Sequence, residues 1–226
     1  MLKRATLATL VLAALPMQAY AADGMVKLDA HVSTLGGGLE LAMPMTERYT
    51  ARLGFNQFKF SASENSGGVT FSGDLKLSSV TTLVDWRPWS GVTHLTAGVI
   101  FNSNKLELSG TVANGSTYDA SGTTFTCAAT GGCGVNTSVG FNKVSPYLGI
   151  GWSGQPKKQG FSFSTDIGIL FQGSPSATVN SQGTWTAGGV STTTAALDAD
   201  AQKQLNSDLS SFKYYPVISV GIGYTF

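Results

Sequence analysis

The C-terminal end of the chain is the feature that most limits its fold. From Pro216 to Phe226, large and small side chains alternate strictly, which is the pattern of a β-strand. One face carries Pro216, Ile218, Val220, Ile222, Tyr224 and Phe226, and the other carries mostly small residues. This arrangement suits a wall with lipid on one side and a narrow interior on the other. An edge strand of a soluble β-sandwich is the alternative at this point.

The N-terminus has the composition of a secretory signal peptide. Basic Lys3 and Arg4 precede an apolar stretch from Ala5 to Met17, and small residues at Ala19 and Ala21 form a cleavage site. The apolar stretch is too short for a membrane helix, which needs ~20 residues. We therefore predict a signal peptide over 1–21 and a mature domain over 22–226. No later stretch is apolar enough for a membrane helix, so a membrane location would require strands.

The composition favours a barrel over a soluble enzyme. Charged residues make up 12% of the chain, about half of the ~25% usual in soluble domains. The 28 glycines supply the small side chains that a narrow interior needs. The formal net charge is only +1, and no basic stripe is present, so nucleic acid is not expected as a partner.

Period-two patterning continues through the chain and predicts an all-β, eight-stranded antiparallel transmembrane barrel. A first strand through 26–32 is followed by strands through 32–45, 49–61, 74–86, 93–105, 144–152, 161–172 and 216–226. The alternation changes phase near Ser33, which we interpret as a tight turn through Gly36–Gly38. A bulge within one long strand is the alternative. In the strand through 74–86 we place Leu75, Leu77 and Leu83 outward, which leaves the direction of Asp85 open.

The connections between these strands differ in length. Short turns at 46–48, 87–91 and 155–159 contrast with long segments at 62–73, 106–143 and 174–213, which is the asymmetry of outer-membrane barrels. We predict the long segments as outer loops, and the Gly/Ser/Thr content of 106–143 and 174–213 predicts mobile polar surfaces there. Residues 197–212 have helical spacing with Asp198 as a possible N-cap, so we expect a short helix over the barrel mouth, either as plain cover or as a lid. Membrane-interface anchors are expected at Trp89, Trp152, Tyr224 and Phe226.

The two cysteines, Cys127 and Cys133, lie close together in Cys-Ala-Ala-Thr-Gly-Gly-Cys. In an exported chain, a close pair of this kind favours a disulfide that closes a small loop. A metal site is the weaker alternative, because no histidine or further cysteine lies near.

Four stretches resemble a known family. They are Trp86-Arg-Pro-Trp89, Ser145-Pro-Tyr-Leu-Gly-Ile-Gly-Trp152, Gln172-Gly-Ser-Pro-Ser-Ala-Thr-Val179 and Tyr215-Pro-Val-Ile-Ser-Val-Gly221. Similar stretches recur in the same order in small proteobacterial outer-membrane barrels, and the chain resembles the carbapenem-susceptibility-associated barrels of Acinetobacter, proposed as uptake channels for basic amino acids such as ornithine. The resemblance implies an outer-membrane location in a Gram-negative bacterium. The ending on Tyr-Xaa-Phe also resembles the terminal strand that the barrel-assembly machinery recognises.

An eight-stranded barrel leaves an interior that side chains can nearly fill. The predicted faces direct both signs of charge inward, and Glu40 lies diagonal to Arg52 across the first periplasmic turn. Buried charges must be paired or hydrated. The interior is therefore either a salt-bridged, partly wet plug or a narrow path in which Asp29, Glu40 and Asp166 attract cations. The lumen-lining candidates are Lys27, Asp29, His31, Glu40, Arg52, Lys76, His94, Lys143, Tyr147, Asp166 and Gln172.

No catalytic pattern is visible. His94 shares a face with Thr96, but this face is the predicted lumen and no adjacent carboxylate is evident. We expect no catalysis, metal or cofactor. The predicted role is structural or surface-exposed, with two alternatives: a narrow porin-like channel for small solutes such as basic amino acids, and adhesion or ligand binding by the outer loops. The expected partners are outer-membrane lipid, the barrel-assembly machinery and small solutes, and the chain is expected to be a monomer.

Overall fold

The computed structural model describes residues 25–66, 69–89, 91–154 and 159–226. The predicted signal peptide and most of the predicted turn at 155–159 lie outside the described residues. No described helix is both long enough and apolar enough to cross a membrane.

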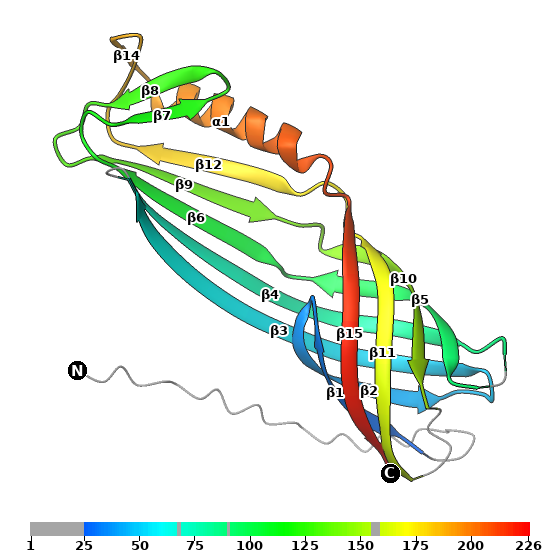
Figure 1. The fold of residues 1–226 in the computed structure, drawn as a ribbon. Coiled ribbons are helices and arrows are strands. Elements are labelled where there is room, and N and C mark those ends of the chain that lie inside the picture. Colours follow the sequence, from blue (N-terminus) through cyan, green and yellow to red (C-terminus); the bar gives the residue numbers. More distant parts are fainter. Residues whose placement is uncertain (1–24, 67–68, 90, 155–158) are drawn as a thin grey trace, which may run out of the picture.

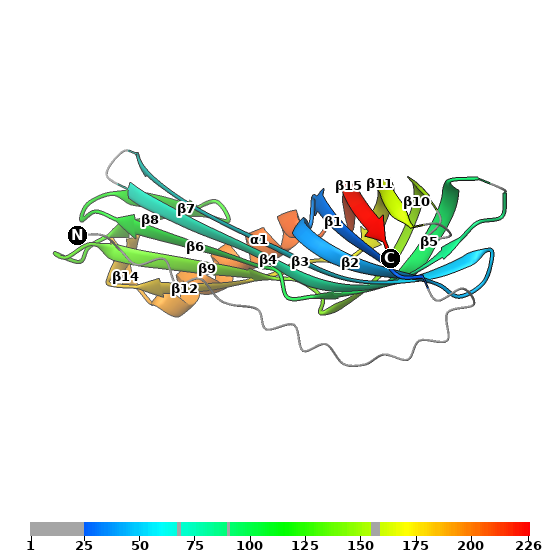
Figure 2. The ribbon, with the colours of Figure 1, turned by 90° about the horizontal axis from the view of Figure 1, so that it is seen from below.

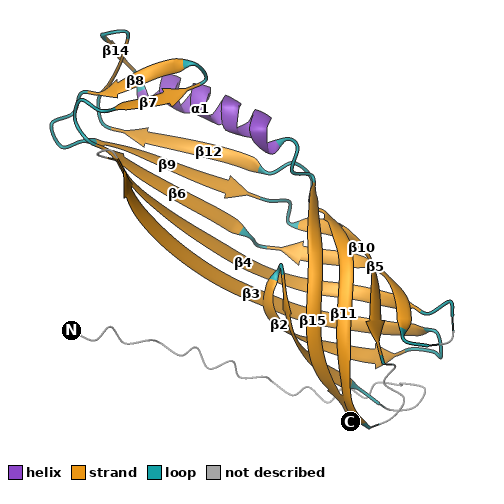
Figure 3. Cartoon of the chain, in the orientation of Figure 1, coloured by secondary structure: helices purple, strands orange, loops and turns teal. Residues whose placement is uncertain are grey.

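The C-terminal strand pattern predicted the architecture correctly, because the chain forms a closed barrel of eight antiparallel strands (Figure 1, Figure 3). The last strand pairs with the first, and β5 pairs with both β4 and β10, so the ring has no free edge. The barrel strands are β1 (Lys27–Ser33), β2 (Gly36–Pro44), β3 (Tyr49–Ser66), β4 (Val69–Trp86), β5 (Thr93–Asn102), β10 (Val144–Ser153), β11 (Gly160–Phe171) and β15 (Tyr214–Thr225).

The outward face of the barrel is apolar. Leu148, Ile167 and Val220 are 55%, 48% and 56% exposed, so they do not pack together in a dry centre. The sandwich alternative is therefore wrong.

The phase change near Ser33 marks two strands, and the bulge alternative is wrong. The turn lies at Thr34 and Leu35, before the glycines that were predicted to form it. Gly36–Gly38 instead begin β2. Gly36 has a φ of +113°, which favours glycine. A Cβ on Gly38 would lie only 2.8 Å from the side chains of His31 and Asn56, so this glycine makes room for them.

Two strands continue far beyond the barrel. The lower half of β4 pairs with β5 over Ser79–Trp86, and its upper half pairs with β6 (Lys105–Val112) over Val69–Lys76. Two further strands, β9 (Cys133–Gly140) and β12 (Ser176–Gln182), extend the same sheet outward from β6. We call this upper sheet, with the elements that cover it, the outer domain; Figure 2 shows it continuing from one side of the barrel.

The prediction of long loops at 62–73, 106–143 and 174–213 is wrong. Residues 62–66 continue β3, residues 69–73 belong to β4, 106–143 hold β6 to β9, and 174–213 hold β12 to β14 and a helix. Part of the serine content that indicated loops belongs to the water-facing side of strands, as at Ser63, Ser72 and Ser109. The small covering sheet consists of β7 (Thr117–Ala120), β8 (Thr123–Cys127), β13 (Trp185–Ala187) and β14 (Val190–Thr192).

The helix is α1 (Thr194–Leu209), within the last of these segments as predicted. Its N-cap is Thr193, whose hydroxyl accepts from the Ala196 amide at 3.3 Å, so the prediction of Asp198 as N-cap is wrong. The helix lies along β12 in the outer domain and not over the barrel mouth (Figure 1).

The position of α1 explains how the free edge of β12 is protected. The Asp198 carboxylate accepts from the Ser181 amide and the Asn206 side chain accepts from the Ala177 amide, each at 2.8 Å. The helix therefore supplies partners to amides that an exposed edge would offer to another chain.

The outer domain has its own apolar core. Large side chains from the upper sheet, the small sheet and α1 meet there, and Trp185 and Leu197 are completely buried. The members are Val112, Phe125, Cys127, Cys133, Val135, Val179, Trp185, Leu197 and Ala201.

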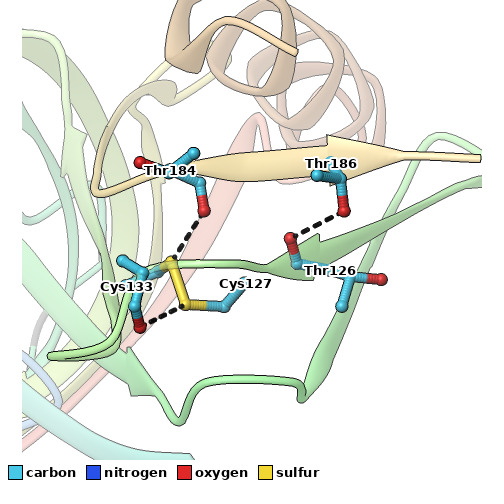
Figure 4. The surroundings of a disulfide bond; sticks show 6 residues. Thr126, Cys127, Cys133, Thr184 and Thr186 are labelled. Carbon is cyan, nitrogen blue, oxygen red and sulfur yellow. Dashed lines mark hydrogen bonds between the residues drawn. A yellow bond between two sulfur atoms is a disulfide. The ribbon is translucent and has the colours of Figure 1, made fainter. Parts of the chain in front are cut away.

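The predicted disulfide between Cys127 and Cys133 is confirmed and joins the end of β8 to the start of β9, with the two Cα atoms 5.7 Å apart (Figure 4). Cys133 Sγ lies 3.3 Å from the Thr184 carbonyl oxygen, a packing contact because a disulfide sulfur carries no proton. The Thr186 hydroxyl donates to the Thr126 carbonyl at 3.5 Å, next to the bond. The disulfide thus ties the small sheet to the upper sheet.

Candidate functional site: the barrel lumen

Arg52 is the centre of a charged layer that crosses the lumen. Its two terminal nitrogens lie 3.1 and 3.2 Å from the two carboxylate oxygens of Asp166, which is a bidentate pair. Its Nε lies 3.4 Å from an oxygen of Glu40 and 3.4 Å from an oxygen of Asp85, close enough for ionic attraction but outside hydrogen-bond geometry. One guanidinium therefore faces three carboxylates contributed by β2, β4 and β11.

His94 completes this layer from β5. Its side chain is fully buried, and Nε2 lies 3.1 Å from Asp166 and 3.7 Å from Asp85. Asp85 also accepts a hydrogen bond from the Thr96 hydroxyl at 2.8 Å. A Cβ on Gly151 would lie 2.5 Å from both His94 Nε2 and Asp166 Oδ1, so this glycine leaves the space in which the two side chains meet.

Further polar pairs surround the layer. Lys27 lies 2.7 Å from Asp29, which also accepts from the Ser164 hydroxyl at 3.0 Å. Arg87 donates to the hydroxyls of Thr50 at 2.9 Å and Ser153 at 3.2 Å. The buried charges of Lys27, Asp29 and the layer around Arg52 are thus paired, and the buried Arg87 is hydrogen-bonded to hydroxyls, because unpartnered burial of a charge is costly.

An apolar cluster lies on the outer side of the charged layer. It consists of Leu35, Leu83, Ile100, Tyr147, Leu170 and Val217, with Tyr215 packed against it. Leu35 comes from the outer turn between β1 and β2, and Leu170 and Val217 lie near the outer ends of β11 and β15. Tyr147 fits because Gly149 and Gly168 leave room for its ring.

Two small cavities flank Arg52. They measure about 40 and 10 Å³, and Asp29, Glu40, Arg52 and Ser164 line both of them. One water needs ~10–15 Å³ in this measure, so the larger cavity has room for a few waters and the smaller for one at most. The side chains of the charged layer stand between the two spaces.

The structure places nine of the eleven lumen candidates inside the barrel. Lys27, Asp29, Glu40, Arg52, His94 and Asp166 belong to the ion pairs above, and Tyr147 to the apolar cluster. His31 hydrogen-bonds Asn56 at 2.6 Å, and the buried Gln172 donates to the Phe212 carbonyl at 3.0 Å.

Two candidates do not face the lumen, so their assignment was wrong. Lys76 stands on the water-exposed face of the outer domain, where it lies 2.6 Å from Glu107, because β4 continues past the barrel. Lys143 is exposed just before β10 begins, above the barrel rim.

The strand β4 also corrects one predicted face. Leu83 is buried in the lumen at 5% exposure and not outward, and Asp85 is buried at 1%. The outward residues are the even-numbered ones, among them Val80, Val84 and Trp86. Leu83 packs in the apolar cluster inside the barrel, so an apolar residue stands at a position where the alternation predicts a polar one.

The predicted interface anchors lie at the strand ends near the C-terminus and the short turns. Trp89, Trp152 and Phe226 are 60%, 41% and 64% exposed. Tyr224 is half-buried and stacks edge-on between Phe161 and Phe226, with ring centroids 4.9 and 5.0 Å away. Amphipathic rings at this level suit a membrane interface.

Sequence reasoning did not single out several polar residues of the lumen, among them Asn56, Asp85 and Arg87. The parity of β3 would have given Asn56, and Thr96 was placed on the lumen face without its role as the donor to Asp85. Asp85 and Arg87 require the correct parity of β4, which Leu75, Leu77 and Leu83 obscured. Among the described residues, no group of three or more His, Cys, Asp or Glu side chains is arranged to hold a metal ion.

Comparison with known proteins supports the fold. The chain is similar to the crystal structure of CarO from Acinetobacter baumannii, with 24% identity, a TM-score of 0.57, and coverage of 88% of this chain and 97% of that one. It is also similar to the crystal structure of CarO2 from the same organism, with 20% identity, a TM-score of 0.61, and coverage of 89% and 98%. Its fold is the fold of CarO. No family model matches the chain, and no curated protein matches its sequence.

The likeness to these barrels confirms the family resemblance seen in the four sequence stretches. It extends over nearly the full length of both crystal structures, so the outer domain falls within the shared architecture. At these identities the likeness concerns the fold.

Proposed function

We propose that this chain is an outer-membrane protein whose lumen is a closed, ion-paired core and whose working part is the outer domain, held at the cell surface. The observation that carries the proposal is the charged layer around Arg52, which the apolar cluster covers on its outer side. Outer-membrane lipid is then the partner of the apolar outward face, and the barrel-assembly machinery the partner of β15. The chain works as a monomer.

The ion pairs oppose passage of a solute. A solute that crosses the layer must part Arg52 from Asp166, and separating a buried pair leaves uncompensated charges at a cost of about 3–5 kcal/mol. It must then displace Leu35, Tyr147 and Leu170 from the apolar cluster. Both steps argue for a structural lumen over a narrow cation path.

The outer domain supports a surface role. It is folded, with a buried core, a disulfide and a helix that protects its sheet edge. A structure of this kind presents a fixed shape to the outside, which is what recognition at a surface requires.

Planar-bilayer recordings test the closed lumen. We expect the purified native chain to give no conductance steps, and an Arg52→Ala, Tyr147→Ala double variant to give small ones. Steps in the native chain that are cation-selective and disappear in Asp166→Asn would overturn the proposal in favour of a channel.

Labelling of intact cells tests the surface location. Both cysteines of the chain are in the disulfide, so an introduced cysteine is the one free thiol. A membrane-impermeant maleimide should label Ser109→Cys on the outer domain, and should label Arg48→Cys at the opposite end only after the cells are lysed. Labelling of Arg48→Cys in intact cells would contradict this orientation.

A further inference from the structure

The outer domain contains a cavity that its own core does not fill. It measures about 410 Å³, within the range of small-molecule sites. The inner face of β3, β4, β6 and β9 forms its floor, and Tyr118 of β7 and Leu205 of α1 close it from the other side. The cavity is more than ten times the size of the spaces in the lumen.

The walls of this cavity are mainly apolar and open to water. Phe71 is 50% exposed and Leu108 is 43% exposed, although both stand on the face that carries the core a few residues away. Phe58 and Phe60 of β3 lie on this same face and are 45% and 56% exposed. Exposed apolar surface of this kind on a water-soluble domain marks a binding site.

One carboxylate stands in the apolar wall. Glu64 is directly opposite Phe71 in the β3–β4 ladder, so its side chain and the Phe71 ring lie on the same face. No ion pair links Glu64 to another described residue, and it is the one charged side chain among the described residues that line the cavity. The cavity is therefore negative and aromatic, without a counter-charge of its own.

We propose that this cavity binds a small aromatic or aliphatic molecule with a single positive charge. The apolar body would lie against Leu108, Val112, Val135 and Leu205, and the cation would lie near Glu64 and the faces of Phe71 and Tyr118. A cation gains from both the carboxylate and the aromatic quadrupoles. An anionic amphiphile such as a fatty acid is repelled by Glu64, and a neutral one gains only from burial.

The fit to a small molecule also follows from the shape of the site. Tyr118 is half-buried and its ring packs 6.5 Å from Trp185, so the far wall is continuous with the domain core. A site walled on both sides and apolar at its base suits a compact ligand more than a flat partner surface.

Two variants of β6 distinguish binding in the cavity from binding elsewhere on the domain. A Cβ on Gly110 would meet the Phe71 ring at 3.7 Å, an ordinary contact, so Gly110→Phe places its ring in the cavity without a clash at its base. Thr111→Phe adds the same ring to the opposite, water-facing side of the strand, and serves as the matched control.

The experiment uses the full chain in lipid nanodiscs and a fluorescent pair of equal size: 9-(aminomethyl)anthracene as cation and anthracene-9-carboxylate as anion. Anisotropy is measured for each variant, and subtraction of the signal from empty nanodiscs of the same lipid removes partition into lipid. We expect the native chain and Thr111→Phe to bind the cation about tenfold or more tightly than Gly110→Phe does, a factor worth ~1.4 kcal/mol. Glu64→Gln should remove most of the preference for cation over anion.

Three results would overturn the proposal. One is equal binding of the cation by the native chain and Gly110→Phe. A second is binding of the anion as tightly as the cation. The third is a dimer of the native chain in detergent that Gly110→Phe dissociates, which would assign the cavity to a second copy of the chain. Conductance of the lumen has no bearing on these results, so this proposal and the closed lumen fail independently.

Discussion

The barrel and the outer domain share two strands, yet they use the faces of those strands in opposite ways. In the barrel, β3 turns Leu53 and Phe55 to lipid and Arg52 and Asn56 inward. Above the barrel the same alternation sends Gln57, Lys59 and Ser61 outward and Phe58 and Phe60 inward. The strand β4 changes in the same way, with Val80 and Val84 outward below and Lys76 and Asp74 outward above. The apolar face thus moves from the outside to the inside within one strand.

This inversion shows that solvent decides which face is apolar, while the strand itself continues unbroken. Lipid requires an apolar outer wall and leaves the polar groups to pair inside, as around Arg52. Water requires a polar outer wall and leaves the apolar groups to pack inside, as around Trp185. We therefore propose that the change between Phe55 and Gln57 lies at the outer edge of the hydrocarbon layer on β3.

The strongest test of this difference between the barrel and the outer domain is to remove the positive charge at the centre of the barrel. Arg52→Met leaves Glu40, Asp85 and Asp166 without their shared cation and should destabilise the barrel by about 3–5 kcal/mol. Guanidinium unfolding and the heat-dependent gel shift of the barrel measure this loss. A Trp185 reporter, with the other three tryptophans changed to phenylalanine, should show that the outer domain is unaffected.

The matched control is Lys76→Met, which removes the same sign of charge from the exposed face of β4. Its effect should stay within about 0.5 kcal/mol. Equal losses from Arg52→Met and Lys76→Met would contradict the difference between the two regions.

A charge placed on the outward face tests where the lipid ends. Leu53→Arg puts a guanidinium into the lipid-facing wall and should cost about 2–4 kcal/mol of barrel stability. Gln57→Arg adds the same group on the same face above the proposed boundary and should cost close to nothing. Folding into lipid vesicles of defined thickness gives both values. If Gln57→Arg costs as much as Leu53→Arg, the boundary lies higher than the inversion indicates.

The sequence was sufficient for the barrel because lipid enforces a strict alternation on every spanning strand. Pro216–Phe226 and Val144–Trp152 show it without interruption, and both were placed correctly. The outer domain escaped prediction because its water-facing residues, such as Ser63, Ser72 and Ser109, have the composition of loops. In the sequence of β3, the large apolar residues change from odd positions, such as Phe55, to even positions, such as Phe58. Recognition of this change would have extended the predicted strand beyond Ser61.

The alternation of side chains along each strand predicts which residues face the lumen, but it does not predict which of them form pairs. Arg52 and Asp166 could be assigned inward, but nothing in their spacing indicated that they would form a bidentate pair across the barrel. Lys76 was assigned to the lumen because the position of the membrane along β4 was unknown.

Loss of the disulfide should affect the outer domain alone. Replacement of Cys127 and Cys133 by alanine removes the link between β8 and β9 and should lower the stability of the outer domain by about 2 kcal/mol, the value expected for a loop this short. The Trp185 reporter detects this change, and the gel shift of the barrel should not move. A loss shared by both regions would mean that they unfold together.

The edge of the outer sheet should respond to a single carboxylate on α1. Asp198→Ala removes the acceptor for the Ser181 amide and should cost about 1 kcal/mol, with faster hydrogen exchange at that amide. Asp208→Ala, also on α1 but exposed, is the control for loss of the same charge. Unchanged exchange at Ser181 would show that the helix does not protect the edge of β12.

The smallest effect concerns the polar face of the outer domain, where Glu107 lies between two lysines. Lys105 and Lys76 each donate to its carboxylate at 2.6 Å, and these hydrogen bonds, with the attraction of both ammonium groups, lower the pKa of Glu107 to about 2. A lowered pKa means that the carboxylate stabilises the fold above its ordinary pKa of 4.5, and that this contribution is lost as the pH falls from there towards 2. The groups are well exposed, so solvent and salt keep the stabilisation small.

A carboxyl titration of Glu107 followed by NMR should give a midpoint near 2 in the native chain and a higher one in Lys105→Met. A native midpoint near 4.5 would show that water has separated the three charges. In the lumen, by contrast, the same kinds of group are held in contact because water has too little room to come between them.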